Sequence, residues 1–72
     1  MSVVGGIELG RALGQTMAQI NTQIEEVKKT AKVLDVQSSE LRDMNGNFVM
    51  VPLLAAKAQT LHALVLINQR RN

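Results

Sequence analysis

The chain has 72 residues and a formal net charge of +2, from eight Lys and Arg against six Asp and Glu. It holds no Cys, which excludes disulfides, thiolate chemistry and cysteine-based zinc sites. A chain of this length forms one domain at most and buries only about 60% of its unfolded surface. We therefore expect a single domain over residues 1–72 that gains stability by assembling with other copies of itself.

A long helix is predicted over residues 7–41, after a flexible lead-in over residues 1–6 whose adjacent glycines disfavour a helix start. Its apolar residues recur at steps of four and three, the spacing of one continuous helical face. The residues that flank this face are mostly uncharged, which is typical of a bundle rather than of an isolated two-stranded coiled coil. The predicted apolar face consists of Leu13, Met17, Ile20, Ile24, Val27, Ala31 and Leu34.

The same helix carries a ridge of small residues, because Gly6, Gly10, Gly14 and Ala18 recur every four positions. Such a ridge lets two helix backbones approach closely. The alternative is that the glycines weaken the helix, so that it bends or frays near them.

Residues 42–51 are predicted as a turn, because an Asn-Gly pair lies at their centre. A tiny β-hairpin across this turn and an extended loop are equally compatible with the sequence. The segment that starts at Asp43 begins like a calcium loop, but Phe48 and Leu54 stand where glycine and glutamate are needed. We therefore expect no metal and no cofactor.

A second helix is predicted over residues 52–70, with Pro52 at its first position and a seam made of Leu54, Ala58, Leu61 and Val65. Because it is about half as long as the first helix, we expect it to cover only the C-terminal half of that helix. The N-terminal half is then left to pair with another copy. The predicted fold is an all-α helical hairpin that assembles into an oligomeric helical bundle. Its expected oligomer interface consists of Gly6, Gly10, Leu13, Gly14, Met17, Ile20, Leu61, Leu64 and Val65.

The polar residues form no catalytic pattern. His62 is the only histidine, the serines lack the context of a nucleophile, and the glycines form no phosphate-binding motif. We therefore predict that the protein is not an enzyme. The basic residues are expected to form a solvated surface or, alternatively, an anion-binding site completed between subunits. The candidate residues for that site are Lys28, Lys32, Arg42, Lys57, Arg70 and Arg71.

Two functions follow from this pattern. The first is a non-enzymatic oligomeric helical protein that acts through protein–protein contacts, as an adaptor, an assembly subunit or an inhibitor. The second is an oligomeric binder that sequesters a small anionic ligand such as a cyclic nucleotide. In size, helical character and expected oligomerisation, the chain resembles small phage proteins that sequester the cyclic nucleotides of bacterial immunity. Extended nucleic acid is disfavoured as a partner, because stacking aromatic residues are missing.

The expected location is the cytoplasm, or the host cytoplasm if the protein is encoded by a virus. Neither a secretory signal nor an apolar run of the ~20 residues that span a bilayer is recognisable in the sequence. We therefore expect no membrane-spanning segment.

Overall fold

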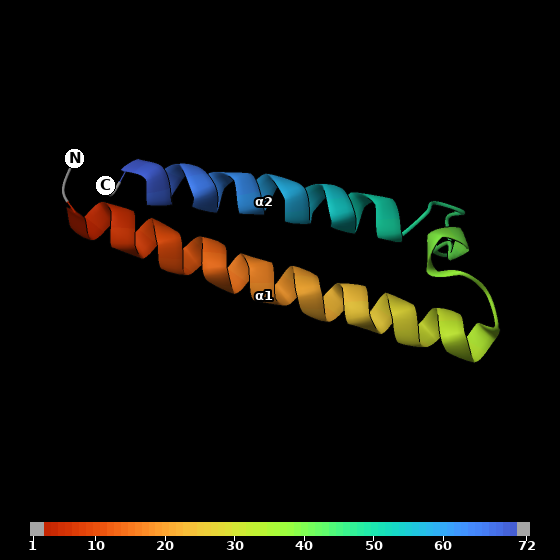
Figure 1. The fold of residues 1–72 in the computed structure, drawn as a ribbon. Coiled ribbons are helices and arrows are strands. Elements are labelled where there is room, and N and C mark those ends of the chain that lie inside the picture. The colour runs from red at the N-terminus through yellow and green to blue at the C-terminus, as the bar shows by residue number, and fades with distance from the viewer. Residues whose placement is uncertain (1–2, 71–72) are drawn as a thin grey trace.

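A computed structural model describes the backbone of residues 3–70 and the side chains of residues 7–70. Two long helices, α1 (Val3–Leu34) and α2 (Met50–Arg70), run antiparallel side by side, joined by a connector with a short 3-10 helix, η1 (Ser38–Glu40) (Figure 1). The predicted all-α helical hairpin is confirmed. The molecule is a rod of 49 × 20 × 15 Å, with α1 as its long element.

The predicted apolar face of α1 packs against the rest of the chain over most of its length. Ile20, Ile24 and Ala31 are buried, and the other members as far as Val27 are half-buried. Leu34 is 58% exposed, because it is the last residue of the helix. The face therefore ends at Ala31, one helical turn earlier than predicted.

The start of α1 differs from the prediction. The helix begins at Val3 and runs without a break through Gly5, Gly6, Gly10 and Gly14. Most of the predicted lead-in is therefore helical, and residues 1–2 lie outside the described part of the chain. The helical spacing of the residues that follow outweighs the cost of the glycines, which is about 1 kcal/mol each relative to alanine.

The end of α1 also differs, because the helix stops at Leu34 instead of at residue 41. Asp35 adopts a left-handed conformation with φ of 58°. Its N–H donates to the carbonyl of Lys32 at 3.2 Å, and the N–H of Val36 donates to the carbonyl of Ala31 at 3.0 Å. This pair of hydrogen bonds is a Schellman motif, which terminates a helix. Glycine normally occupies this position, and because an aspartate stands there the helix end was not recognisable in the sequence.

The early end of α1 overturns the expectation that its N-terminal half has no partner within the chain. The connector spans residues 35–49 and runs back along α1, so that α2 begins beside Ile24, where Met50 packs with Ile20 and Ile24. From there α2 extends for 21 residues, or ~32 Å, towards the start of α1. The two chain ends consequently lie at the same end of the rod (Figure 1).

The helix α2 begins at Met50, two residues before the predicted position of Pro52 as the first helical residue. Pro52 remains in the first turn, where its missing N–H costs no intrahelical hydrogen bond. The predicted turn over residues 42–51 is therefore shorter at its C-terminal side. Instead of a β-hairpin with strands, it contains one isolated antiparallel bridge, between Arg42 and Phe48.

The face of α2 that packs on α1 is a different one from the predicted seam. Leu54, Leu61 and Val65 are 50%, 53% and 44% exposed, and Ala58 is exposed as well. Because α2 is apolar around much of its circumference, the sequence pattern fits more than one face. We call the packed side the inner face; it consists of the buried or half-buried residues Met50, Leu53, Ala56, Lys57, Thr60, Ala63, Leu64 and Ile67.

By length and composition alone, α2 is long and apolar enough to cross a membrane, with a mean hydropathy of 1.6 over the best window, 11% of which is buried. The sequence expectation of no such segment therefore does not hold on these two criteria. Lys57, Gln59, Thr60 and His62 nevertheless lie near its middle, where polar groups in a bilayer are most costly.

Candidate functional site

The most conspicuous surface of the hairpin is an exposed apolar row on α2 that flanks the inner face. We call it the outer face and define it as Val51, Leu54, Ala58, Leu61 and Val65. Steps of three and four place these residues in one row along the helix. The row is ~21 Å long, and its Leu and Val side chains are between 44% and 62% exposed. It contains no charged residue, so α2 presents apolar surface to solvent as well as to α1.

The hairpin by itself leaves an unusually large surface in contact with water. Its accessible surface is 5752 Å² for 7.9 kDa, whereas a compact monomer of that mass exposes about 4,400 Å². Its radius of gyration is 15.6 Å, against about 11 Å for a compact domain of this length. The excess of about 1,300 Å² exceeds the roughly 800 Å² that each partner loses in a standard protein interface.

The hydrophobic core is correspondingly small. Within residues 7–70, the buried apolar residues are Ile20, Ile24, Ala31 and Met50. Val27, Leu53 and Ala56 pack against this group but remain partly exposed. Helices of this kind gain most of their stability from packing an apolar face. A core of this size supplies little apolar burial to hold the two helices together.

The connector ends in a compact loop organised by the carboxylate of Asp43. One carboxylate oxygen, Oδ1, accepts hydrogen bonds from the backbone N–H groups of Asn45 at 2.9 Å and Asn47 at 3.0 Å. The backbone N–H of Gly46, which has φ of 81°, donates to the Asp43 carbonyl at 3.0 Å. This is an Asx-type turn, in which an aspartate side chain binds its own following backbone. Asp43 therefore has a structural role in shaping the loop.

Arg42 closes this loop from the other side. Its Nη1 donates to the carbonyl of Gly46 at 2.9 Å, and its guanidinium carbon lies 4.0 Å from the centroid of the Phe48 ring. A guanidinium over an aromatic face is a favourable cation–π arrangement. Arg42, a predicted anion-binding residue, is thus engaged within its own loop.

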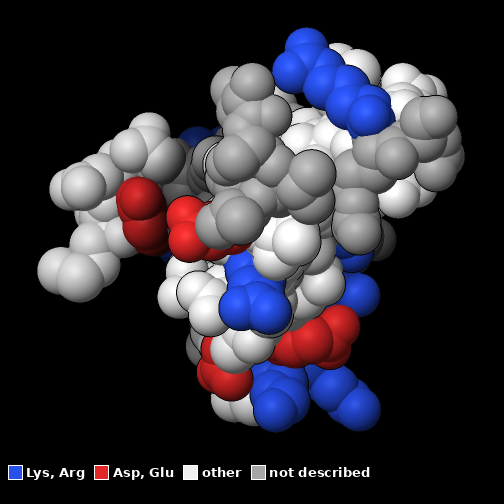
Figure 2. Space-filling model, turned by 90° about the vertical axis from the view of Figure 1, so that its left-hand side faces the viewer, with Lys and Arg blue, Asp and Glu red and all other residues white. Residues whose placement is uncertain are grey.

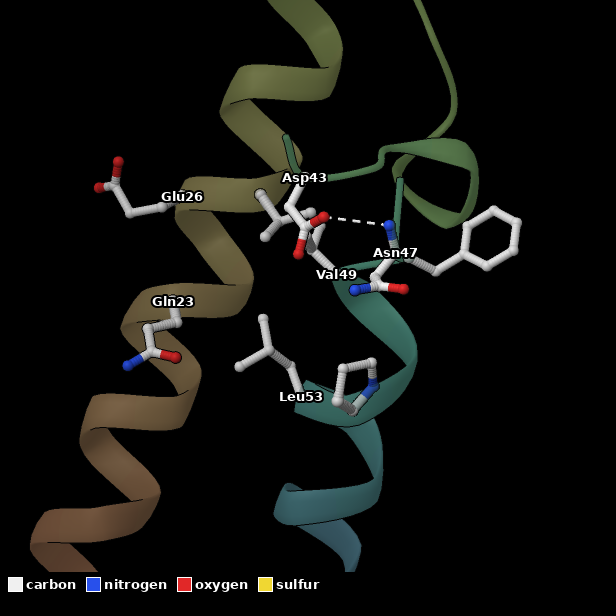
Figure 3. Close-up of a pocket in the computed structure, with 9 residues that line it drawn as sticks. Gln23, Glu26, Asp43, Asn47, Val49 and Leu53 are labelled. Carbon is white, nitrogen blue, oxygen red and sulfur yellow. Dashed lines mark hydrogen bonds between the residues drawn. The ribbon is translucent and has the colours of Figure 1, made fainter. Parts of the chain in front are cut away.

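A shallow, open groove of about 650 Å³ lies where this loop meets the two helices. Leu53 projects from α2 towards α1 in its floor, and the carboxylate of Glu26 on α1 points away from α2 (Figure 3). The charged residues that line it are Glu26 and Asp43, and none of the predicted anion-binding residues that the structure describes is among the lining residues. Its lining residues are Gln23, Glu26, Val27, Asp43, Asn47, Phe48, Val49, Pro52 and Leu53.

Five of the six predicted anion-binding residues lie in the described part of the chain, and these five are dispersed over the hairpin. Lys28 lies 3.6 Å from Glu25 in an exposed ion pair, Lys32 is in the last turn of α1, and Lys57 is half-buried on the inner face. Arg70 is the last residue of α2, at the opposite end of the rod from Lys32. Figure 2, which views the end that carries both termini, shows basic side chains at separate places with acidic ones between them. Arg71 lies outside the described residues.

The predicted oligomer-interface residues fall into two groups. The first group packs within the chain: Gly10, Leu13, Met17 and Leu64 are half-buried and Ile20 is buried. The second group is exposed, and consists of Gly14 on α1 together with Leu61 and Val65 on the outer face. Gly6 lies outside the residues whose burial the structure describes.

The small-residue ridge of α1 makes no close contact within the hairpin. A side-chain carbon added at Gly10 or Gly14 would meet no atom of the rest of the chain within 4 Å. The helix is also continuous through both positions, so the alternative of a bend does not apply.

Within the described residues, no group of three or more His, Asp or Glu side chains is arranged to hold a metal ion. His62 is exposed on α2, at the edge of the outer face. No family model matches the chain, and neither a curated protein nor a solved structure matches it. Leu61 and Val65 were predicted as oligomer-interface residues, whereas Val51, Leu54 and Ala58 of the outer face were not. The wide apolar circumference of α2 was the signal that could have revealed them.

Proposed function

We propose that this is a non-enzymatic helical protein that functions as a homo-oligomer, acting through protein–protein contacts as an assembly subunit. The observation that carries the proposal is the outer face of α2, an uncharged apolar row left in solvent by a hairpin with a small core. Contiguous exposed apolar surface larger than a few hundred Å² typically marks an interaction site.

Rough energetics favour assembly. Each half-exposed Leu or Val side chain that leaves water contributes about 1 kcal/mol. Two copies that cover each other's outer faces remove several such side chains each, a gain comparable in size with the lower estimates, about 4 kcal/mol and above, of the cost of association. Burial of this face also raises the stability of each hairpin, because a second copy that binds only the folded chain shifts the folding equilibrium towards the folded state.

Sequestration of a small anionic ligand has weaker support. Among the candidate cations that the structure describes, Lys32 and Arg70 lie at opposite ends of the rod, and the groove beside the loop is lined by two carboxylates. A site for phosphate groups would need several subunits to bring these cations together. A thermal-shift panel of cyclic di- and oligonucleotides tests this alternative, because a ligand at 100 times its Kd raises the stability of the protein by about 2.7 kcal/mol.

The main experiment compares oligomeric state in variants of the two exposed apolar surfaces. The unaltered protein is expected to elute with a mass above 7.9 kDa in size-exclusion chromatography with light scattering at micromolar concentration. The double variant Leu54→Gln/Leu61→Gln, which makes the outer face polar, is expected to shift towards the monomer mass.

The matched control is Val33→Gln/Leu34→Gln, which replaces two apolar side chains at 85% and 58% exposure near the end of α1. It is expected to keep the mass of the unaltered protein. A folded monomer for the unaltered chain would contradict the proposal, as would an outer-face variant that assembles like the control.

A further inference from the structure

We infer that the outer face docks on the outer face of a second copy, with the two α2 helices antiparallel and Ala58 at the two-fold axis. This inference rests on the proposed function and specifies its partner and geometry. Its starting point is that the outer face has the same residue order in both directions from Ala58: Val51, Leu54, Ala58, Leu61 and Val65. A self-complementary surface is what a two-fold symmetric interface requires.

The spacing of the outer face matches this axis. Val51 and Val65 each lie seven residues from Ala58, or ~10 Å along the helix. An antiparallel copy centred on the same residue therefore brings Val51 to the level of the second Val65. Leu54 is brought within one residue of the level of the second Leu61, a displacement of ~1.5 Å. Each large side chain thus meets another large side chain.

The residue at the centre of the row is the smallest of the five. Helix axes approach to ~8 Å where small side chains face each other, and stay nearer ~10 Å where large ones do. With Ala58 at the crossing point, the flanking Leu side chains of each helix pack beside the other helix instead of holding it off. Ala58 is exposed in the hairpin, so this position is open to a partner.

Charge favours the antiparallel direction. The described residues of α2 include Lys57 and Arg70 but no Asp or Glu. Parallel pairing would place Arg70 beside its own counterpart, a like-charge contact that the helix cannot neutralise. The antiparallel arrangement separates the two Arg70 residues by 24 helical positions, or ~36 Å. It also puts the two connectors at opposite ends of the assembly.

The same features favour a second copy over a lipid surface. Thr60 is buried in the hairpin and Lys57 is half-buried, so these two polar residues face α1, while Gln59 and His62 are exposed. A helix that spans a bilayer needs an apolar surface around its whole circumference, and in α2 this surface is interrupted by Lys57 and Thr60. The outer face itself is only a narrow row. The excess surface of about 1,300 Å² per chain is close to what an obligate helical dimer covers.

Single cysteines test the geometry directly, because the chain has none of its own. The variants Val51→Cys and Val65→Cys are oxidised separately and as an equimolar mixture, followed by non-reducing electrophoresis. Antiparallel pairing predicts a cross-linked dimer in the mixture, in up to about half of the chains, the share of mixed pairs under random exchange. It predicts little cross-linking of either variant alone. Ala58→Cys is expected to cross-link with itself, since its two copies meet at the axis.

The control is Gln15→Cys, an exposed position of α1 outside its apolar face, which is expected to remain uncross-linked. Cross-linking of Val51→Cys alone, with none gained in the mixture, would overturn the antiparallel geometry while leaving oligomerisation intact. A monomer by light scattering would instead overturn the proposed function. A monomer that co-sediments with phosphatidylcholine vesicles would show that the outer face is covered by lipid. Circular dichroism of each variant checks that the hairpin is folded.

Discussion

The two faces of α2 differ in a way that apolarity does not explain. The inner face packs on α1 although it includes Lys57 and the buried Thr60, whose hydroxyl donates to the Ala56 carbonyl at 2.8 Å. The outer face is made of Val, Leu and Ala and is left in solvent. Hydrophobicity alone would have assigned the contact with α1 to the outer face. Instead, α2 leaves the connector with Met50 directed at α1, and the side of α2 that carries Met50 makes the contact.

The inner and outer faces of α2 have different roles. The inner face carries small residues, Ala56 and Ala63, that let α2 lie along α1, and it includes Thr60, whose hydroxyl donates a hydrogen bond within the helix. In the proposed dimer, the large apolar side chains of the outer face make the contact with a second copy. Damage to the inner face should therefore unfold the hairpin, whereas damage to the outer face should dissociate it.

The largest expected effect on stability comes from truncating a buried side chain of α1 that packs against the inner face. Ile24 is 5% exposed and packs with Met50. Ile24→Ala is expected to destabilise the protein by about 2–5 kcal/mol, through lost burial and the cavity left behind. The measurement is urea unfolding followed by circular dichroism at fixed protein concentration.

Val33→Ala serves as the control for this experiment, since Val33 lies on the same helix at 85% exposure. Its effect is expected to stay within about 0.5 kcal/mol. Equal effects of the two substitutions would show that the inner face does not hold the hairpin together.

An intermediate effect is expected at the loop that sets the position of α2. Asp43→Ala removes the acceptor of two backbone hydrogen bonds, and in this exposed loop the loss is expected to cost about 1–2 kcal/mol. Asp43→Asn keeps a side-chain oxygen and should restore most of the stability. Hydrogen exchange of the amides over residues 42–50 is the readout, and unchanged protection in Asp43→Ala would refute the structural role of this carboxylate.

The smallest expected effect, and the one of opposite sign, is at the end of α1. Asp35→Gly removes a side chain from a left-handed position and a negative charge from a helix C-terminus, and is expected to stabilise the protein by about 0.5–1 kcal/mol. Asp35→Ala keeps the unfavourable conformation and should give no such gain. Thermal unfolding of the two variants distinguishes them, and a gain in both would place the cause in the charge alone.

Much of the fold was predictable because it depends on local spacing. The steps of three and four from Leu13 to Ala31 predicted both the helix and its buried face, and the Asn-Gly pair predicted the reversal of the chain. The end of α1 was not predictable in the same way, because an aspartate occupies the left-handed position that glycine usually marks. From that single error followed the wrong pairing of the two helices, since seven residues moved from α1 to the connector.

The candidate site was predictable only in part. Leu61 and Val65 were expected in the oligomer interface and lie on the exposed outer face, but they were grouped there with residues of α1 that pack within the chain. The five candidate basic residues that the structure describes share a charge but no location, and only the structure could show that Arg42 is held by Phe48 and Gly46.

The sequence by itself determined that the chain forms two amphipathic helices around a turn, because side-chain periodicity and turn chemistry are properties of neighbouring residues. It also determined that α2 has more apolar surface than one partner can cover. Only the tertiary structure decided which face of α2 meets α1, because that depends on where the connector releases α2 along α1. The row centred on Ala58 became a candidate interface once the other side of the helix was seen to be occupied.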